Sequence, residues 1–273
     1  MPLTALAIAL GAAVIHALWN LVIARSPDNQ ATTAVAIFAG TLVALPLALL
    51  RWNVQPEAWP WIVASSVLEL VYFYLLTAAY SRAEMSLVYP IARGMAPVLV
   101  LIVSIAFGVQ FHPWQIAGVA LVGGGVMLVR GIRGGARWSD VVLALAVATS
   151  IAGYTLVDKE GVRHADPATY LFLILIAPAV AGVLFVAARG GWSRVRRAIA
   201  WQAIAAGIGT TAAYTLVLVA LSLAPAASVA AVREVSVVFA VFLGAVLLRE
   251  KVGKSRWIGA LVVAAGVVLV VLG

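Results

Sequence analysis

Two kinds of residue are scarce in this sequence of 273 amino acids: it has no cysteine, and only 10% of its residues are charged. The absence of cysteine excludes disulfides, thiolate metal sites, iron–sulfur clusters and cysteine nucleophiles. A soluble domain is usually about one-quarter charged, and a soluble fold could not cover so much apolar surface. Because 64% of the residues are hydrophobic, we predict an integral membrane protein.

Signatures of enzymes and of metal sites are also missing. There is no Gly-x-Ser-x-Gly nucleophile motif, and Gly253-Lys-Ser255 lacks the earlier glycine of a phosphate-binding loop. The three histidines have no metal-ligand spacing. Asp158 and the other aspartates are predicted in loops or at span ends, with Asp158-Lys-Glu160 as a solvated helix terminus. We therefore expect no enzyme activity, no cofactor and no metal.

Ten apolar stretches of 17 to 25 residues are present, which is the length that ~30 Å of hydrocarbon requires. They are separated by loops too short to hold a soluble domain. The predicted spans are 3–24, 31–50, 58–80, 85–107, 113–129, 138–157, 168–188, 198–222, 225–247 and 256–272. The N-terminal stretch lacks a basic leader and is longer than a signal-peptide core, so we interpret it as a retained first span.

The chain contains an internal repeat. His16-Ala-Leu-Trp-Asn-Leu-Val22 matches Ile151-Ala-Gly-Tyr-Thr-Leu-Val157, and Arg93 matches Arg233. Each half, 1–130 and 138–273, holds five spans, and an odd number places the halves in opposite orientations. The predicted fold is therefore an all-α membrane domain of ten transmembrane helices in two inverted five-helix repeats. In proteins of this kind the substrate site lies near the midplane, between the halves.

The net charge of +8 does not indicate a nucleic-acid partner, because the basic residues are scattered over short loops. The connections after odd-numbered spans carry 13 of the 18 Lys and Arg residues, and the other connections carry 3. The positive-inside rule would place these basic connections in the cytoplasm and both termini outside.

Four ionisable residues lie deep inside predicted spans: Glu69, Arg93, Arg233 and Glu234. Charges at that depth usually pair or line a water-filled cavity, so they are candidate substrate-binding residues. Arginines there could hold a carboxylate or phosphate through forked hydrogen bonds. The alternative is a purely structural ion-pair lattice. A buried glutamate can also carry a proton, so we hypothesise that Glu69 or Glu234 couples transport to protons.

Proline and glycine surround the first of these arginines. Pro90, Gly94 and Pro97 flank Arg93, and proline removes a helical hydrogen bond. We therefore expect the fourth span to be kinked or locally broken near Arg93.

A second candidate layer is aromatic and polar. Flat apolar walls with a few hydrogen-bonding tips suit a metabolite cavity, although ordinary helix packing uses the same residues. His16 is on the same side of the first span as Trp19, and Tyr74 and Tyr214 are repeat equivalents. The candidates are Trp19, Asn20, Tyr72, Tyr89, Tyr154 and Tyr214. Glycines of the fifth and tenth spans, such as Gly118 and Gly259, are expected to allow close helix packing.

The sequence resembles the EamA-type family of the drug/metabolite transporter superfamily. The resemblance depends on the two tandem five-span halves, on Leu247-Leu-Arg-Glu-Lys-Val-Gly253 and on the glycine-spaced last span from Trp257 to Leu269. It implies a multi-pass permease or exporter of small metabolites in the cell (inner) membrane. It also implies cytoplasmic termini, opposite to the charge rule, so both orientations stay open.

We therefore expect a secondary transporter that moves a small anionic or zwitterionic metabolite by alternating access. Its expected partners are the lipid bilayer, the substrate and protons, in a monomer or homodimer. The alternative is a non-transporting membrane subunit with a structural or regulatory role.

Overall fold

The computed structural model describes the chain except for residues 83–84, 131–136 and 248–251. The described part of the chain contains no β-strand and is almost entirely helical. The helices are α1 (Leu3–Ala24), α2 (Asn29–Leu50), the short 3₁₀ helix η1 (Pro56–Ala58), α3 (Trp59–Arg82), α4 (Met85–Ala106), α5 (Pro113–Arg130), α6 (Trp138–Gly161), α7 (Pro167–Ala198), α8 (Trp201–Leu223), α9 (Ala226–Arg233), α10 (Val235–Leu247) and α11 (Lys254–Leu272).

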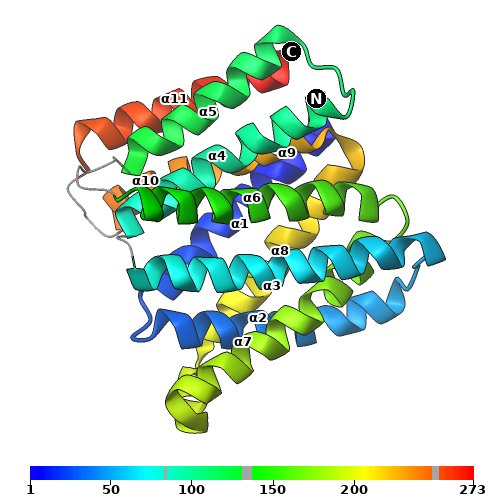
Figure 1. The fold of residues 1–273 in the computed structure, drawn as a ribbon, viewed down its shortest axis with the longest axis vertical. Coiled ribbons are helices and arrows are strands. Elements are labelled where there is room, and N and C mark those ends of the chain that lie inside the picture. Colours follow the sequence, from blue (N-terminus) through cyan, green and yellow to red (C-terminus); the bar gives the residue numbers. More distant parts are fainter. Residues whose placement is uncertain (83–84, 131–136, 248–251) are drawn as a thin grey trace.

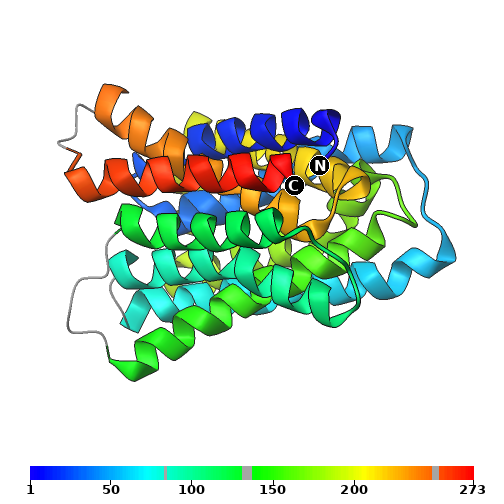
Figure 2. The same cartoon turned by 90° about the horizontal axis from the view of Figure 1, so that it is seen from above.

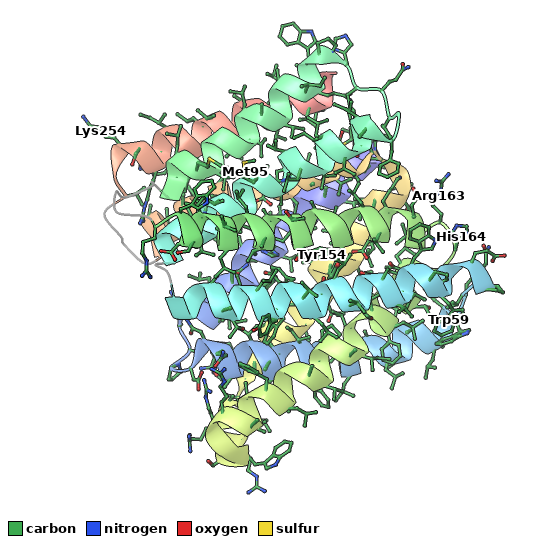
Figure 3. All side chains as sticks on the ribbon, in the orientation of Figure 1. Trp59, Met95, Tyr154, Arg163, His164 and Lys254 are labelled. Atoms are coloured by element: carbon green, nitrogen blue, oxygen red, sulfur yellow. The ribbon has the colours of Figure 1, made fainter. Side chains whose placement is uncertain are left out.

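The predicted fold class is confirmed. Among the described residues, 8 segments are long and apolar enough to cross a membrane, and Pro90–Ala106 and Pro113–Val129 are shorter apolar helices. Together they give ten spans, with α9 and α10 sharing the ninth. Figure 3 marks the two ends of the bundle: Lys254 lies at one end, and Trp59, Arg163 and His164 lie at the other. We call the Lys254 end the basic face, and the opposite end, which bears both chain termini, the terminal face.

The two halves pack reciprocally. Helix α1 packs against α8, and α3 packs against α6. The first span of each half therefore packs against the third span of the other half. Helix α4 packs against α6, and α9 and α10 pack against α1 in the same way. Two pairs, α2 with α7 and α5 with α11, join equivalent spans of the two halves. Helices α5 and α11 run side by side in both views (Figures 1 and 2).

One helix break lies in the half opposite to the expected one. Helix α4 is continuous from Met85 to Ala106 with Pro90 and Pro97 inside it, so the predicted local break beside Arg93 is wrong. The ninth span is interrupted instead, between Arg233 and Val235. There the Glu234 amide donates to the Ala231 carbonyl at 3.1 Å, a tighter turn than an α-helix makes.

Glycines bring α5 and α11 together. A Cβ atom added to Gly118 would lie 2.6 Å from the Gly266 carbonyl oxygen, and one added to Gly266 would lie 2.7 Å from that of Gly118. Gly125 and Gly259 face each other in the same reciprocal way, at 2.9 and 2.7 Å. Small residues allow membrane helices this close approach. These glycines therefore allow close helix packing within the chain, as expected from the sequence.

Two aspartates cap equivalent helices and pair across the repeat. The Asp28 carboxylate accepts from the Ala31 amide at the start of α2, and Asp166 accepts from the Ala168 amide at the start of α7. Arg194 donates to both oxygens of Asp28, at 2.6 and 2.9 Å. The corresponding pair of Asp166 with Arg51 is longer, at 3.9 Å. An aspartate–arginine pair thus joins α2 to α7 at each end of the bundle, and the pair at the basic face has the shorter distances.

Gly259→Ala should destabilise the fold, because its methyl group would meet backbone atoms of α5 that cannot move aside. We expect a loss of about 1–3 kcal/mol, measured as a lower apparent melting temperature of the purified protein in detergent. Gly124→Ala is the matched control, since nothing lies within 4 Å of an added Cβ there. Equal melting temperatures for the two variants would contradict this packing.

The Arg194 guanidinium beside Asp28 lowers the pKa of that carboxyl below its usual value. A lowered pKa means that the pair stabilises the folded state at neutral pH and that this contribution is lost as the pH falls through the lowered value. Asp28→Asn should cost less than about 1 kcal/mol at neutral pH, because the site is partly exposed. The difference in melting temperature from wild type should vanish in acid. Asp166→Asn should show a smaller difference at neutral pH. A difference between Asp28→Asn and wild type that persists unchanged in acid would contradict the assignment to the Asp28–Arg194 pair.

Candidate functional site

A cavity of about 190 Å³ lies between the two halves, with walls from both. Three of the four predicted charged residues line it: Glu69, Arg93 and Arg233. Four of the predicted aromatic residues line it as well: Trp19, Tyr72, Tyr154 and Tyr214. In Figure 3, Tyr154 lies in the middle of the bundle, away from both ends. The structure thus brings together, near the midplane, residues that lie up to 214 positions apart in the sequence.

The cavity extends from the midplane toward the basic face. Its outermost lining residues are Ile23, in the last turn of α1, and Thr33, in the second turn of α2. No described lining residue comes from the last turn of a helix on the terminal side. The site is therefore closed toward the terminal face.

The first arginine is engaged by the protein itself. The Arg93 Nε atom lies 3.2 Å from a carboxylate oxygen of Glu234, whose side chain is 1% exposed. A second nitrogen of Arg93 donates to the Ser236 hydroxyl at 3.4 Å. The Arg93–Glu234 contact is an ion pair by distance, but its angles do not meet those of a regular hydrogen bond. Arg93 therefore joins α4 to the break between α9 and α10 while one side of it borders the cavity.

The second arginine has different surroundings. Arg233 is 7% exposed and forms no ion pair within 4 Å among the described residues. Its Nε atom is buried and donates no hydrogen bond to any described atom. Its charge acts on Glu69 and Asp158, which are close enough for electrostatic interaction. Arg233 is thus a buried cation on the cavity wall whose Nε donor has no acceptor among the described residues.

Asp158 contradicts its sequence-based interpretation. The span expected to end at residue 157 continues to Gly161, and Asp158 is 0% exposed. It accepts hydrogen bonds from Ser65 at 2.5 Å, from Tyr214 at 2.7 Å and from Tyr170 at 3.1 Å. We call Asp158 and these three hydroxyls the Asp158 cluster. It joins α3, α6, α7 and α8 at the closed end of the cavity.

The residues that follow Asp158 behave differently from one another. The Lys159 ammonium donates to the carbonyls of Leu221 and Ala224, at 2.6 and 3.1 Å, and so caps the end of α8. Glu160 forms an exposed pair with Arg163 at 2.9 Å. Only Glu160 therefore fits the expected solvated terminus. A buried acid at this position could not be found from hydropathy, because Asp158 directly follows the last apolar residue of its span.

One tyrosine connects the cavity with the Asp158 cluster. The Tyr214 hydroxyl lies 2.9 Å from a carboxyl oxygen of Glu69 and 2.7 Å from one of Asp158. Its ring continues an aromatic wall, 6.3 Å from the ring of Tyr154, which is 6.0 Å from that of Tyr72. Tyr74, its expected repeat equivalent, is 69% exposed on the outside of the bundle. Equivalent positions in the two repeats thus need not both face the cavity; the packing of the helices decides which tyrosines line it.

The opposite wall holds Trp19 and His16. Their rings meet edge to face at 4.8 Å, and both residues line the cavity as expected from their spacing. The indole Nε1 of Trp19 is buried and has no hydrogen-bond partner among the described residues. Within the described part of the chain, the indole of Trp19 and the Nε of Arg233 are thus two buried donors on the cavity wall without a protein acceptor.

Three predicted site residues are not placed on the cavity wall. Glu234 lies behind Arg93, and the amide of Asn20 donates to the His16 carbonyl at 2.8 Å within α1. The side chain of Tyr89 falls outside the described part of the structure. Glu234 thus pairs with Arg93 behind the cavity wall, and the side chain of Asn20 is hydrogen-bonded within its own helix. No group of three or more acidic or histidine side chains in the described ranges could hold a metal ion.

Comparison with known proteins supports a transporter. The model of the EamA-like transporter family matches residues 3–131 and again residues 138–272. The chain is 24% identical over 257 residues to the uncharacterized transporter YwfM of Bacillus subtilis (strain 168), covering 90% of this chain and 86% of that protein. It is 30% identical over 137 residues to an uncharacterized transporter in the cobO 3' region of Sinorhizobium sp, covering 48% of this chain and 92% of that protein. A solved crystal structure shares the fold, with a TM-score of 0.77 at 18% identity over 98% of both chains.

Arg93→Gln should destabilise the fold strongly, because it leaves the buried Glu234 carboxylate without its counter-charge. The expected cost is about 3–5 kcal/mol, read as a lower apparent melting temperature in detergent. The double variant Arg93→Gln/Glu234→Gln should recover most of the loss. A single variant as stable as wild type would show that the ion pair does not hold α4 to the helix break.

Proposed function

Because the chain belongs to the EamA-like transporter family, we propose that it is a secondary transporter whose midplane cavity binds a small metabolite bearing a carboxylate or a similar anionic group. One observation carries this proposal: Arg233 lines the cavity with a buried Nε donor that has no acceptor among the described residues. An unpaired buried donor costs free energy. A ligand with an anionic oxygen would satisfy it with a charge-assisted hydrogen bond.

The rest of the cavity suits a small molecule with an apolar body. Tyr72, Tyr154 and Trp19 form flat walls, which pack well against rings and short alkyl chains. Glu69 lies on the wall beside Tyr214 and would accept from an ammonium or hydroxyl group. A substrate with both a carboxylate and a donor, such as a zwitterionic metabolite, would therefore match the two ends of this site.

The reciprocal packing of the two halves supports transport by alternating access. The cavity extends toward the basic face and is closed toward the terminal face, where the Asp158 cluster joins four helices. The repeat places Ile23 opposite Asp158 at the offset that aligns Trp19 with Tyr154, and Ile23 lines the cavity. Transport then requires the Asp158 cluster to open while the helices around Ile23 close.

Proton coupling is part of the proposal. Glu69 is the acidic residue on the cavity wall, so it can exchange a proton with water there. Glu234 is 1% exposed and paired with Arg93, which favours Glu69 of the two acids. We therefore assign the exchangeable proton to Glu69.

Arg233→Gln should weaken the binding of anionic ligands by roughly tenfold to a hundredfold, the effect of losing one charge-assisted hydrogen bond. Amino acids, mono- and dicarboxylates, organic phosphates and amines would be screened for thermal stabilisation of the purified protein. Hits would then be tested as radiolabelled substrates in proteoliposomes. Arg233→Lys should retain part of the binding, because lysine keeps the charge but not the fork.

The matched control is Arg163→Gln, which removes an exposed arginine paired with Glu160 and should leave binding unchanged. Stabilisation by amines and not by anions would contradict the proposed ligand class. Equal binding by wild type and Arg233→Gln would contradict the assigned role of Arg233.

A further inference from the structure

We propose that Glu69, Tyr214 and Asp158 share a single proton that moves between the cavity and the closed end of the transporter, and that its arrival at Asp158 loosens that end. The proposal deepens the proposed function and depends on it only for the use of the proton in transport. It rests on the hydrogen-bond geometry around one hydroxyl. Asp158, which carries the inference, is a residue that the sequence placed at a solvated terminus.

Counting donors shows why one proton is shared. The Tyr214 hydroxyl is within hydrogen-bond distance of both Glu69, at 2.9 Å, and Asp158, at 2.7 Å. A hydroxyl has one proton to donate and can accept from another donor. If both carboxyls were ionised, one of these two contacts would join lone pairs to lone pairs. The geometry is therefore satisfied when one of the two carboxyls is protonated.

The other partners decide which carboxyl holds the proton at rest. Asp158 accepts from Ser65 and Tyr170 as well as from Tyr214, and three donors around one carboxyl favour its ionised form. Tyr214 is the only hydroxyl recorded on Glu69 within the described part of the chain. In the resting arrangement, protonated Glu69 donates to the Tyr214 oxygen, and Tyr214 donates to ionised Asp158.

The transfer is balanced in atoms and charge. Tyr214 passes its hydroxyl proton to Asp158 and takes up the proton of Glu69, so that one O–H bond breaks as another forms at each step. Tyr214 is neutral before and after, with its hydroxyl turned toward Glu69. The net result is a neutral Asp158, an ionised Glu69 and the displacement of one proton from the cavity wall to the closed end.

Neutral Asp158 would hold its neighbours less well. Hydrogen bonds to a charged acceptor are stronger than those to a neutral one, so Ser65, Tyr170 and Tyr214 would all lose part of their attachment. These hydroxyls come from α3, α7 and α8, while Asp158 belongs to α6. Gly161, one turn further along α6, leaves room for the Tyr170 ring, because a Cβ there would lie 2.5 Å from the Tyr170 hydroxyl. Proton arrival thus weakens the contact that closes the terminal side.

The charged and titratable surroundings are compatible with one shared proton. Arg233 acts on both carboxyls, and the ionised Glu69 that forms on the cavity side would face it across the site. Six of the helices around the pair contribute such groups. They are His16 on α1, Tyr72 on α3, Arg93 on α4, Tyr154 on α6, Tyr170 on α7 and Arg233 on α9.

Infrared difference spectroscopy on the purified full-length protein, in water and in deuterated water, tests the sharing directly and needs no substrate. Wild type at neutral pH should show the C=O stretch of one protonated carboxyl. Glu69→Gln should abolish it. Asp158→Asn should abolish it too, because Glu69 then has no ionised neighbour and can ionise. Loss of one proton on removal of either acid is the signature that a purely structural role would not give.

Two further variants keep the test decisive. Tyr214→Phe should retain the band but shift its frequency, because the protonated carboxyl loses its hydroxyl partner; this variant serves where Asp158→Asn fails to fold. Glu160→Gln, two residues from Asp158 but exposed, should leave the spectrum unchanged. Absence of the band from wild type, its survival in either acid variant, or an unshifted band in Tyr214→Phe would overturn the shared proton. None of these results depends on which metabolite is carried, so failure here is distinct from failure of the proposed substrate class.

Discussion

A charge buried near the middle of a bilayer must be balanced nearby, and this constraint shapes the centre of the protein. Among the described residues, two arginines and three carboxyls lie near the middle of the bundle: Arg93, Arg233, Glu69, Asp158 and Glu234. The Arg93–Glu234 pair balances itself. That leaves one guanidinium on Arg233 against the two acids bridged by Tyr214, a set that is neutral only when it also holds one proton. The same count thus accounts for a cation available to a ligand and for an acid available to a proton.

The two halves are alike in packing and unlike in charge. The arginines are repeat equivalents, but the residues matching the two acids of the second half are uncharged: Ile23 for Asp158 and Gly94 for Glu234. A fold with two equivalent halves can open to either face at similar cost, because each half can take the packing of the other. Placing Asp158 and Glu234 in one half removes that equivalence. The face closed by the Asp158 cluster then responds to protonation, while the face beside Ile23 closes through apolar contact alone.

The sequence predicted the ten spans and most of the cavity, because hydropathy reports helix length and intramembrane charge is rare. It could not predict the role of Asp158, whose burial depends on which neighbouring helices cover the last turn of α6. The prolines around Arg93 predicted a kink or a local break there; α4 is not broken, and the interrupted span is the ninth, beside Arg233. Proline makes a break possible, but the packing of neighbouring helices decides whether it forms. Orientation in the membrane is likewise decided by insertion and not by the fold.

The position of Tyr214 gives the proposed proton movement its direction. No described residue of the Asp158 cluster other than Tyr214 lines the cavity, so water in the cavity reaches Glu69 but not Asp158. A proton from that side can then neutralise Asp158 only by passing through the hydroxyl. Substrate and proton meet the same wall, since Arg233 acts on both acids. An anionic ligand bound to Arg233 would offset the positive charge that stabilises the ionised form of Glu69. Glu69 would then keep its proton more readily. The proton would therefore reach Asp158 most readily when the site is empty, which predicts that the unloaded carrier reorients with a proton and that substrate and proton move in opposite directions.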